Sequence, residues 1–239
     1  MRVALLFWGL TRSLKLTYPN INDKILNYFN KCKIDYKIYM HTYNFEGLHI
    51  DKRTGERIKL DFDEYKLLNP DYIKIDNQDK IKKEIKIEEY LKMRYTYVRK
   101  TVENLICGLY SLKCVTKMLV DSEEKYDYII YLRPDVLFKS SLPLQWFGWV
   151  NDNRFLVPLF ASCNGINDRF AILTPKLALK YGNRLDRIRE YYEFIKGQRI
   201  SSERFLHWVM REHKPKKINY LFKRVRGNGL ICDKDKKLF

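Results

Sequence analysis

The stretch that most constrains the fold is YDYIIYLRPDVLF, residues 126 to 138. Its apolar run from Tyr128 to Leu132 has the length and the aromatic and β-branched content of a strand that is covered on both faces. Such strands belong to sheets that lie between layers of helices. In open α/β sheets, functional groups gather beyond the carboxyl ends of the strands, so Arg133 and Asp135 are the first candidates for a functional site.

Several other segments carry apolar residues at the helical steps of three and four. The longest, residues 94 to 120, predicts an amphipathic helix whose apolar stripe belongs to the core. An earlier helix is expected to start at a cap of Asn20 or Asn22. Thr174, followed by a proline, is typical of a helix start, and Gly182 of the helix stop. The remaining helices are expected over residues 185–195 and 201–211.

Short apolar runs between these helices predict strands over residues 3–9, 35–43, 71–76, 128–132 and 154–160, a loop turning into a strand over 164–173, and a last strand or extended arm over 217–225. Strands that alternate with helices are typical of an α/β fold. We therefore expect a mainly parallel sheet flanked by helices, with short antiparallel additions near the end, in a single domain over residues 1–239.

The carboxyl ends of the first, second and fourth strands would meet at one edge of such a sheet. That arrangement brings Thr11, Arg12, His41, Arg133 and Asp135 towards one cleft. Asp135 is suited to hold a hard divalent cation, which takes oxygen ligands. The planar fork of donors on Arg133 suits a diphosphate. A cation and an arginine against a diphosphate are what departure of a nucleoside diphosphate from a sugar requires, which suggests glycosyl transfer.

The chain lacks the sequence motifs that are typical of several other functions. It has no G-x-G-x-x-G after the first strand, no G-x-x-x-x-G-K-[ST] and no G-x-S-x-G, so a dinucleotide dehydrogenase, a P-loop NTPase and an α/β-hydrolase lack support. No apolar stretch approaches the roughly 20 residues of a membrane helix, and the apolar start lacks the cleavage site of a signal peptide. Five scattered cysteines indicate reduced thiols in a cytosolic protein.

The charge of the chain is strongly positive. Lys and Arg number 46 against 29 Asp and Glu, a formal charge of +17, and much of the excess lies in residues 80–86 and 214–237. Such an excess attracts polyanions or an anionic membrane, although a solvated surface is the simpler interpretation. A basic nucleic-acid-binding module is therefore one alternative, with aromatic and basic residues interleaved at Tyr220, Phe222, Lys223, Arg224 and Arg226.

Four stretches lie in an order that matches a known pattern: GLTRS at 9–13, IYMHTY at 38–43, the long helix running into YDYIIYLRPDVLF, and NDRFAI at 167–172. Together they resemble the small bacterial and viral glycosyltransferases of the GT-A kind, found among capsule and surface-glycan genes. Three positions depart from that family's pattern. Arg133 replaces the first carboxylate of the D-x-D motif, Tyr43 replaces the tryptophan of H-T-W, and Leu173 replaces a usual glycine.

The resemblance implies a GT-A-like, Rossmann-related fold, with a nucleotide-sugar-binding half over residues 1–135 and an acceptor-binding half with a basic arm over 136–239. It implies a UDP- or GDP-sugar donor held by Gly9, Thr11, Arg12, His41 and Arg133. Asp135 would hold Mn or Mg at the place of D-x-D. The acceptor would be a glycan or a lipid-linked sugar, and the basic carboxyl end of this cytoplasmic enzyme could rest on an anionic membrane.

Four further residues are candidates for the chemistry. Asp168 could activate the acceptor as a general base, or organise its loop through an Asx-turn. Glu203 could take the same role, although the dipole of a helix capped by Ser201 explains it well. His207 and His213 could complete a metal site, with a solvated or core position as the simpler interpretation. An inactive relative that serves as a partner subunit also stays open.

Overall fold

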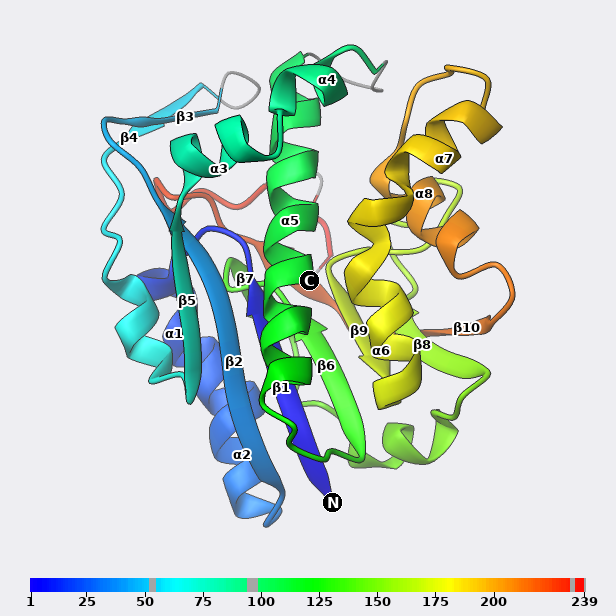
Figure 1. Cartoon of the computed structure of the whole chain (residues 1–239). Coiled ribbons are helices and arrows are strands. Elements are labelled where there is room, and N and C mark those ends of the chain that lie inside the picture. Colours follow the sequence, from blue (N-terminus) through cyan, green and yellow to red (C-terminus); the bar gives the residue numbers. More distant parts are fainter. Residues whose placement is uncertain (52–54, 94–98, 233–234, 239) are drawn as a thin grey trace.

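The computed structural model describes residues 1–51, 55–93, 99–232 and 235–238. In these ranges the chain builds a central sheet of seven strands flanked by helices (Figure 1). In spatial order the strands are β10 (Lys214–Ile218), β8 (Arg154–Pro158), β9 (Phe170–Leu173), β6 (Tyr128–Leu132), β1 (Arg2–Trp8), β2 (Asp35–Asn44) and β5 (Tyr72–Asn77). The strand expected over 128–132 therefore lies near the middle, with neighbours on both sides.

Strand direction confirms the expected α/β class. β1 runs parallel to both β6 and β2, β2 parallel to β5, and β10 parallel to β8. β9 is the antiparallel addition, pairing with β6 and β8. Because β9 runs the opposite way, Phe170 at its start lies opposite Leu132 at the end of β6. The residues just before β9 therefore reach the same sheet edge as those just after β6.

Helices cover both faces of the sheet (Figure 1). One face carries α5 (Arg99–Asp121), α6 (Pro175–Gly182), α7 (Ile188–Phe194) and α8 (Ser202–Val209), and the other carries α1 (Leu14–Ile21) and α2 (Asn27–Lys31). Alternate residues of β1 supply the two cores, with Leu6 in the core under α5 and Leu5 in the core under α1. The expected start of the long helix, residues 94–98, lies outside the described residues.

Shorter elements complete the described chain. They are the hairpin of β3 (His49–Asp51) and β4 (Glu56–Ile58), the 3₁₀ helices η2 (Glu64–Leu68), η3 (Leu144–Trp149) and η4 (Asn183–Arg187), the helices α3 (Gln78–Glu84) and α4 (Ile87–Leu91), and the antiparallel pair of β7 (Val136–Phe138) and β11 (Phe222–Arg224). The single last strand expected over 217–225 is thus divided between β10 and β11, which join different sheets. None of the described helices is long and apolar enough to cross a membrane.

The first helix begins earlier than the sequence suggests. α1 starts at Leu14 and continues through a π-helical turn, η1 (Asn22–Leu26), into α2, so the expected cap at Asn20 or Asn22 is wrong. Pro19 lies inside α1, where its missing N–H usually ends a helix, and the wider π turn follows it. Asn20 instead attaches the helix to β7. Its side chain donates to the Phe138 carbonyl at 3.0 Å and accepts from the Phe138 amide at 2.6 Å.

Helix α6 has the predicted limits, but its last residue serves another purpose. The Thr174 side chain caps the start, accepting from the Leu177 amide. Gly182 has a right-handed φ of −73°, so it is not a left-handed cap. A Cβ there would collide with Thr116 of α5 and lie 2.5 Å from the hydroxyl of Tyr131 of β6. Glycine is therefore required at this position because α6, α5 and β6 approach one another closely there.

Replacing Gly182 by alanine should destabilise the protein by about 1–3 kcal/mol through overpacking, although alanine is the better helix former. Urea denaturation measures this free energy of unfolding. Gly148→Ala is the matched control, since a Cβ at Gly148 meets nothing within 4 Å. A Gly182→Ala protein as stable as wild type would contradict the close approach.

Candidate functional site

A pocket with a cavity volume of about 210 Å³ opens where β1, β2 and β6 end. Its walls come from segments that are far apart in the sequence, including the loop after β1, helix α5, the turn before β9 and strand β11. Among the described residues, its charged walls consist of six arginines and two aspartates: Arg12, Arg133, Arg169, Arg184, Arg224, Arg226, Asp51 and Asp168. The pocket is therefore strongly cationic and suited to an anionic ligand.

Sheet register explains why arginines from different segments meet here. Arg133 follows Leu132, and Arg169 precedes Phe170, the antiparallel partner of Leu132. Arg224 of β11 lies opposite Val136 of β7, directly after Asp135. The Val225 amide also donates to the Asp135 carbonyl at 2.9 Å. Pairing between strands, rather than sequence proximity, therefore concentrates the positive charge.

Asp135 holds two of these arginines, Arg12 and Arg133, in place. It is completely buried, and both of its carboxylate oxygens accept hydrogen bonds. Arg133 donates from Nε and Nη2, each at 2.7 Å, and Arg12 donates from Nη2 at 3.1 Å. Burial alone would raise the pKa of Asp135, but the charges and hydrogen bonds of Arg133 and Arg12 outweigh it and hold the pKa well below its usual range. The three side chains form one buried ion cluster.

The expected Mn or Mg site at Asp135 does not fit this arrangement. Two guanidinium groups already occupy the oxygens of Asp135, which does not line the pocket. His207, the suggested second ligand, is exposed on α8 and does not line the pocket either. His213 lies beside Lys180, with 3.4 Å between its Nε2 and the lysine Nζ. Asp135 therefore orients arginines, and the structure does not present it as a cation ligand.

A second group of possible metal ligands already has a positive charge beside it. Among the described residues, His41, Asp76 and Cys114 offer ligand atoms within 4.8 Å of one another. The Lys74 ammonium, however, lies 3.0 Å from Asp76 Oδ2 and 3.9 Å from Cys114 Sγ. The cluster is thus already neutralised by an internal cation, and none of its three residues lines the pocket.

Asp168 has one carboxylate oxygen that accepts no hydrogen bond. It lines the pocket, and its Oδ1 is buried without a hydrogen-bond partner, 3.9 Å from Nη1 of Arg169, which also lacks one. Burial raises the pKa of Asp168, but the charges of Arg169 and Arg184 outweigh it and lower the pKa. Asp168 is therefore ionised near neutral pH. Buried polar atoms are normally satisfied, so the lack of a hydrogen-bond partner at these two atoms is unusual.

Glu203 stands one layer behind the pocket. It is 8% exposed and does not line the cavity. Its carboxylate accepts from Arg169 Nη2 at 3.1 Å and from the hydroxyls of Ser201 and Ser202 at 2.9 and 3.2 Å. Ser201 caps α8, as expected. Glu203 therefore holds Arg169 in place from behind the wall of the pocket.

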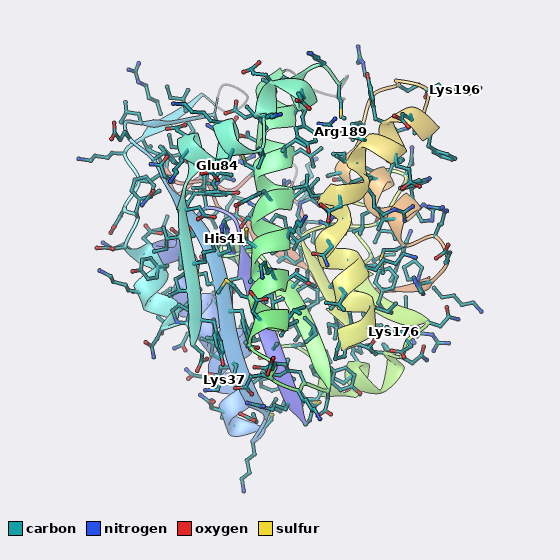
Figure 2. The ribbon with its side chains drawn as sticks, viewed as in Figure 1. Lys37, His41, Glu84, Lys176, Arg189 and Lys196 are labelled. Atoms are coloured by element: carbon teal, nitrogen blue, oxygen red, sulfur yellow. The ribbon has the colours of Figure 1, made fainter. Side chains whose placement is uncertain are left out.

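His41 is also a supporting residue. It is completely buried in the interior beside α5 (Figure 2), with Nε2 3.0 Å from Asp76 and Nδ1 2.7 Å from the Ser111 hydroxyl. Burial lowers the pKa of His41 despite the hydrogen bond to Asp76, so the ring is neutral. Ser111 also accepts from the Gly9 amide at 2.8 Å. His41 thereby supports the Gly9 turn, which has a φ of +98° and lines the pocket.

Of the residues expected at the cleft, the structure places Gly9, Arg12, Arg133 and Asp168 in the pocket wall. Thr11, His41, Asp135 and Glu203 are buried behind it, and the Thr11 carbonyl accepts from the Leu14 amide at 2.9 Å in the turn into α1.

Sequence reasoning missed several pocket residues. Arg184 is 1% exposed, donates to the Tyr181 carbonyl at 2.8 Å and stacks on the Tyr181 ring, although its polar helical context suggests a surface position. Trp8 is the last residue of the buried strand β1, and it lines the pocket beside Arg133. Arg169 lies inside the NDRFAI stretch, directly after Asp168, so its position in that motif was a signal from which it could have been predicted.

Comparison with known proteins shows a likeness in fold only. No family model and no curated protein matches the chain. The galactosyltransferase LgtC, in complex with donor and acceptor sugar analogs, has a TM-score of 0.46 at 12% identity, covering 89% of this chain and 71% of its own. Apo mouse xyloside xylosyltransferase 1 has a TM-score of 0.47 at 10% identity, covering 91% and 85%. At these values the likeness assigns neither a family nor an activity to this chain.

Replacing His41 by asparagine should remove part of the pH dependence of stability. Because the folded-state pKa of His41 is lowered, its contribution is fully present above the unfolded pKa of about 6.5 and is lost as the pH falls below it. Urea denaturation at pH 7.5 and 5.5 should show a shallower decline for His41→Asn, with a difference of at most about 1.4 kcal/mol per pH unit. The exposed His207→Asn should keep the wild-type slope, and an equal slope for His41→Asn would refute this role.

Replacing Asp135 by alanine should cost about 3–5 kcal/mol of stability, because it leaves two partly buried arginines without their shared partner. Chemical denaturation without any added ligand measures this cost. Asp121→Ala is the control, since its exposed pair with Lys117 should contribute no more than about 0.5 kcal/mol. A cost for Asp135→Ala as small as that of the control would show that the ion cluster is not structural.

Proposed function

We propose that this chain is a cytoplasmic glycosyltransferase that moves a sugar from a nucleoside-diphosphate donor, UDP- or GDP-linked, to a hydroxyl group of a glycan or lipid-linked acceptor. The observation that carries the proposal is a pocket at the strand ends in which six arginines line the wall together with Asp168, whose carboxylate is ionised. The formal charge of +17 suits an acceptor that is presented at an anionic membrane surface.

The arginines supply the binding site for a diphosphate. Guanidinium groups bind phosphate oxygens through parallel hydrogen bonds, and fixed orientation adds specificity. Arg133 is held by Asp135 and lies over the Trp8 ring, with 5.2 Å between the guanidinium carbon and the ring centroid. The Trp8 Nε1 donor is buried without a partner in the structure.

Neutral side chains in the same pocket suit the rest of the donor. Tyr43, Gln78 and Asn104 line it together with the arginines. Amide groups both donate and accept hydrogen bonds, whereas the Tyr43 hydroxyl already donates to the Cys107 carbonyl at 2.7 Å. The amide groups match the polar edges of a nucleoside. A pocket with a cationic part and a neutral polar part thus fits both ends of a nucleoside diphosphate.

Asp168 supplies a base for the acceptor. In the proposed step the acceptor oxygen bonds to the anomeric carbon, and the bond from that carbon to the diphosphate oxygen breaks. The acceptor proton passes to the Asp168 carboxylate. Negative charge grows on the leaving oxygen, where the fixed guanidinium groups stabilise it more than they stabilise the donor.

The nucleic-acid alternative loses its main support. Tyr220 and Phe222, the aromatics interleaved with basic residues, are 0% and 1% exposed and pack against Phe138. Rings that are buried in the core cannot stack on bases. An inactive partner protein is the remaining alternative, and turnover of a donor distinguishes it from an enzyme.

A panel of UDP-, GDP-, ADP- and CDP-sugars tests the proposal through thermal stabilisation of the chain and hydrolysis of the donor. One nucleotide class should stabilise the fold and be hydrolysed slowly without an acceptor. If no nucleotide sugar of the panel stabilises the chain or is hydrolysed, the transferase proposal is wrong. Stabilisation by a nucleotide sugar without its hydrolysis would favour the inactive partner protein.

With an accepted donor, Asp168→Asn should lower kcat by about 10²–10⁴-fold, because the neutral amide cannot take the acceptor proton. The KM for the donor should change little. Asp186→Asn is the matched control, because Asp186 is exposed and pairs with Lys113 away from the pocket. Unchanged kcat in Asp168→Asn would remove Asp168 from the reaction.

A further inference from the structure

The pocket offers poor ligands for a divalent cation. Among the described lining residues, the carboxylates are Asp51 and Asp168. Asp51 Oδ2 lies 3.8 Å from Arg226 Nη1, and Asp168 Oδ1 lies 3.9 Å from Arg169 Nη1. Each carboxylate is therefore already beside an arginine. A divalent cation at either one would also be repelled by the other guanidinium groups of the wall.

The cluster on Asp135 provides positive charge in another form. A carboxylate at the end of a buried strand would ordinarily be suited to hold a metal ion there. In this chain the same carboxylate holds two guanidinium groups, with Arg133 engaged through Nε and Nη2 and Arg12 through Nη2. Their side chains keep 23% and 12% exposure, and both line the pocket. The positive charge is therefore part of the chain and is oriented before any ligand arrives.

The arginines of this arrangement outnumber its carboxylate. Arg12 and Arg133 with Asp135 carry a net charge of +1. Arg184 adds a guanidinium group that the Tyr181 carbonyl and ring hold in place; among the described residues no carboxylate lies within 4.0 Å of it, and its charge also acts on Asp168. The leaving diphosphate thus meets fixed positive charge in a partly desolvated setting where it acts strongly.

We infer that this chain binds and releases its nucleoside diphosphate without a divalent cation, with the ion cluster of Arg12, Asp135 and Arg133, together with Arg184, in place of the metal. This inference rests on the proposed glycosyltransferase function. It assigns Asp135 as a positioning residue, since it would act on the diphosphate only through the arginines that it holds.

The first test compares binding with and without metal. Isothermal titration calorimetry of the full chain with UDP and with GDP, in EDTA and then in MnCl₂ or MgCl₂, should give dissociation constants within about twofold for the nucleotide that binds. Turnover of the accepted donor should also agree within twofold. Binding at least tenfold weaker in EDTA would overturn the inference while leaving the transferase proposal intact. Failure of UDP, GDP, ADP and CDP to bind under every condition would overturn the proposed function itself.

The second test uses variants with a matched control. Arg133→Gln should bind the diphosphate at least tenfold more weakly in EDTA, and MnCl₂ should not restore the affinity. Arg12→Gln tests the same point if Arg133→Gln does not fold, as judged by circular dichroism and urea denaturation. Arg189→Gln should keep the wild-type constant, because Arg189 is exposed on the side of α7 that faces α4, where it pairs with Glu89 (Figure 2). Restoration of either weakened variant by Mn would reveal a cation site at Asp135 and overturn the inference.

Discussion

The buried ion cluster of Arg12, Asp135 and Arg133 is the interaction on which the rest of the site depends. It joins the loop after β1 to the turn after β6, two segments that are more than a hundred residues apart in the chain. Burying an isolated carboxylate costs far more than a protein's net stability can offset, so Asp135 requires both partners. Once that requirement is met, two guanidinium groups stand at the carboxyl edge of the sheet with defined orientations.

A second layer of polar residues maintains the pocket around this cluster. The hydrogen-bonded series from Asp76 through His41 and Ser111 to Gly9 connects the ends of three neighbouring strands to α5. Glu203 does the same for Arg169 from the first turn of α8. Buried networks of this kind hold side chains rigid when every member is satisfied. In contrast, Asp168 Oδ1 and Trp8 Nε1 are buried without a hydrogen-bond partner, in two residues that line the pocket.

The sequence predicted the elements of the fold more reliably than their partners. Hydrophobic periodicity and turn chemistry located most strands and helices, because both depend on residues close together in the chain. The start of α1 was misplaced because Pro19 lies inside the helix and a π turn follows it, and because Asn20 bonds to Phe138 of β7 and does not cap the helix. The division of residues 217–225 between two sheets was also hidden, because pairing partners far along the chain decide it.

The sequence by itself determined the α/β class, the strand end at Arg133 and Asp135, and the positive character of the site. Only the tertiary structure decided what those residues do there. Asp135 became an orienting partner because Arg12, from a distant loop, reaches the same carboxylate as Arg133. Arg184 became part of the pocket because the carbonyl and the ring of Tyr181 in α6 hold it in the interior. Local sequence sets backbone preference and side-chain chemistry, whereas the pairing of buried charges depends on which segments the sheet brings together.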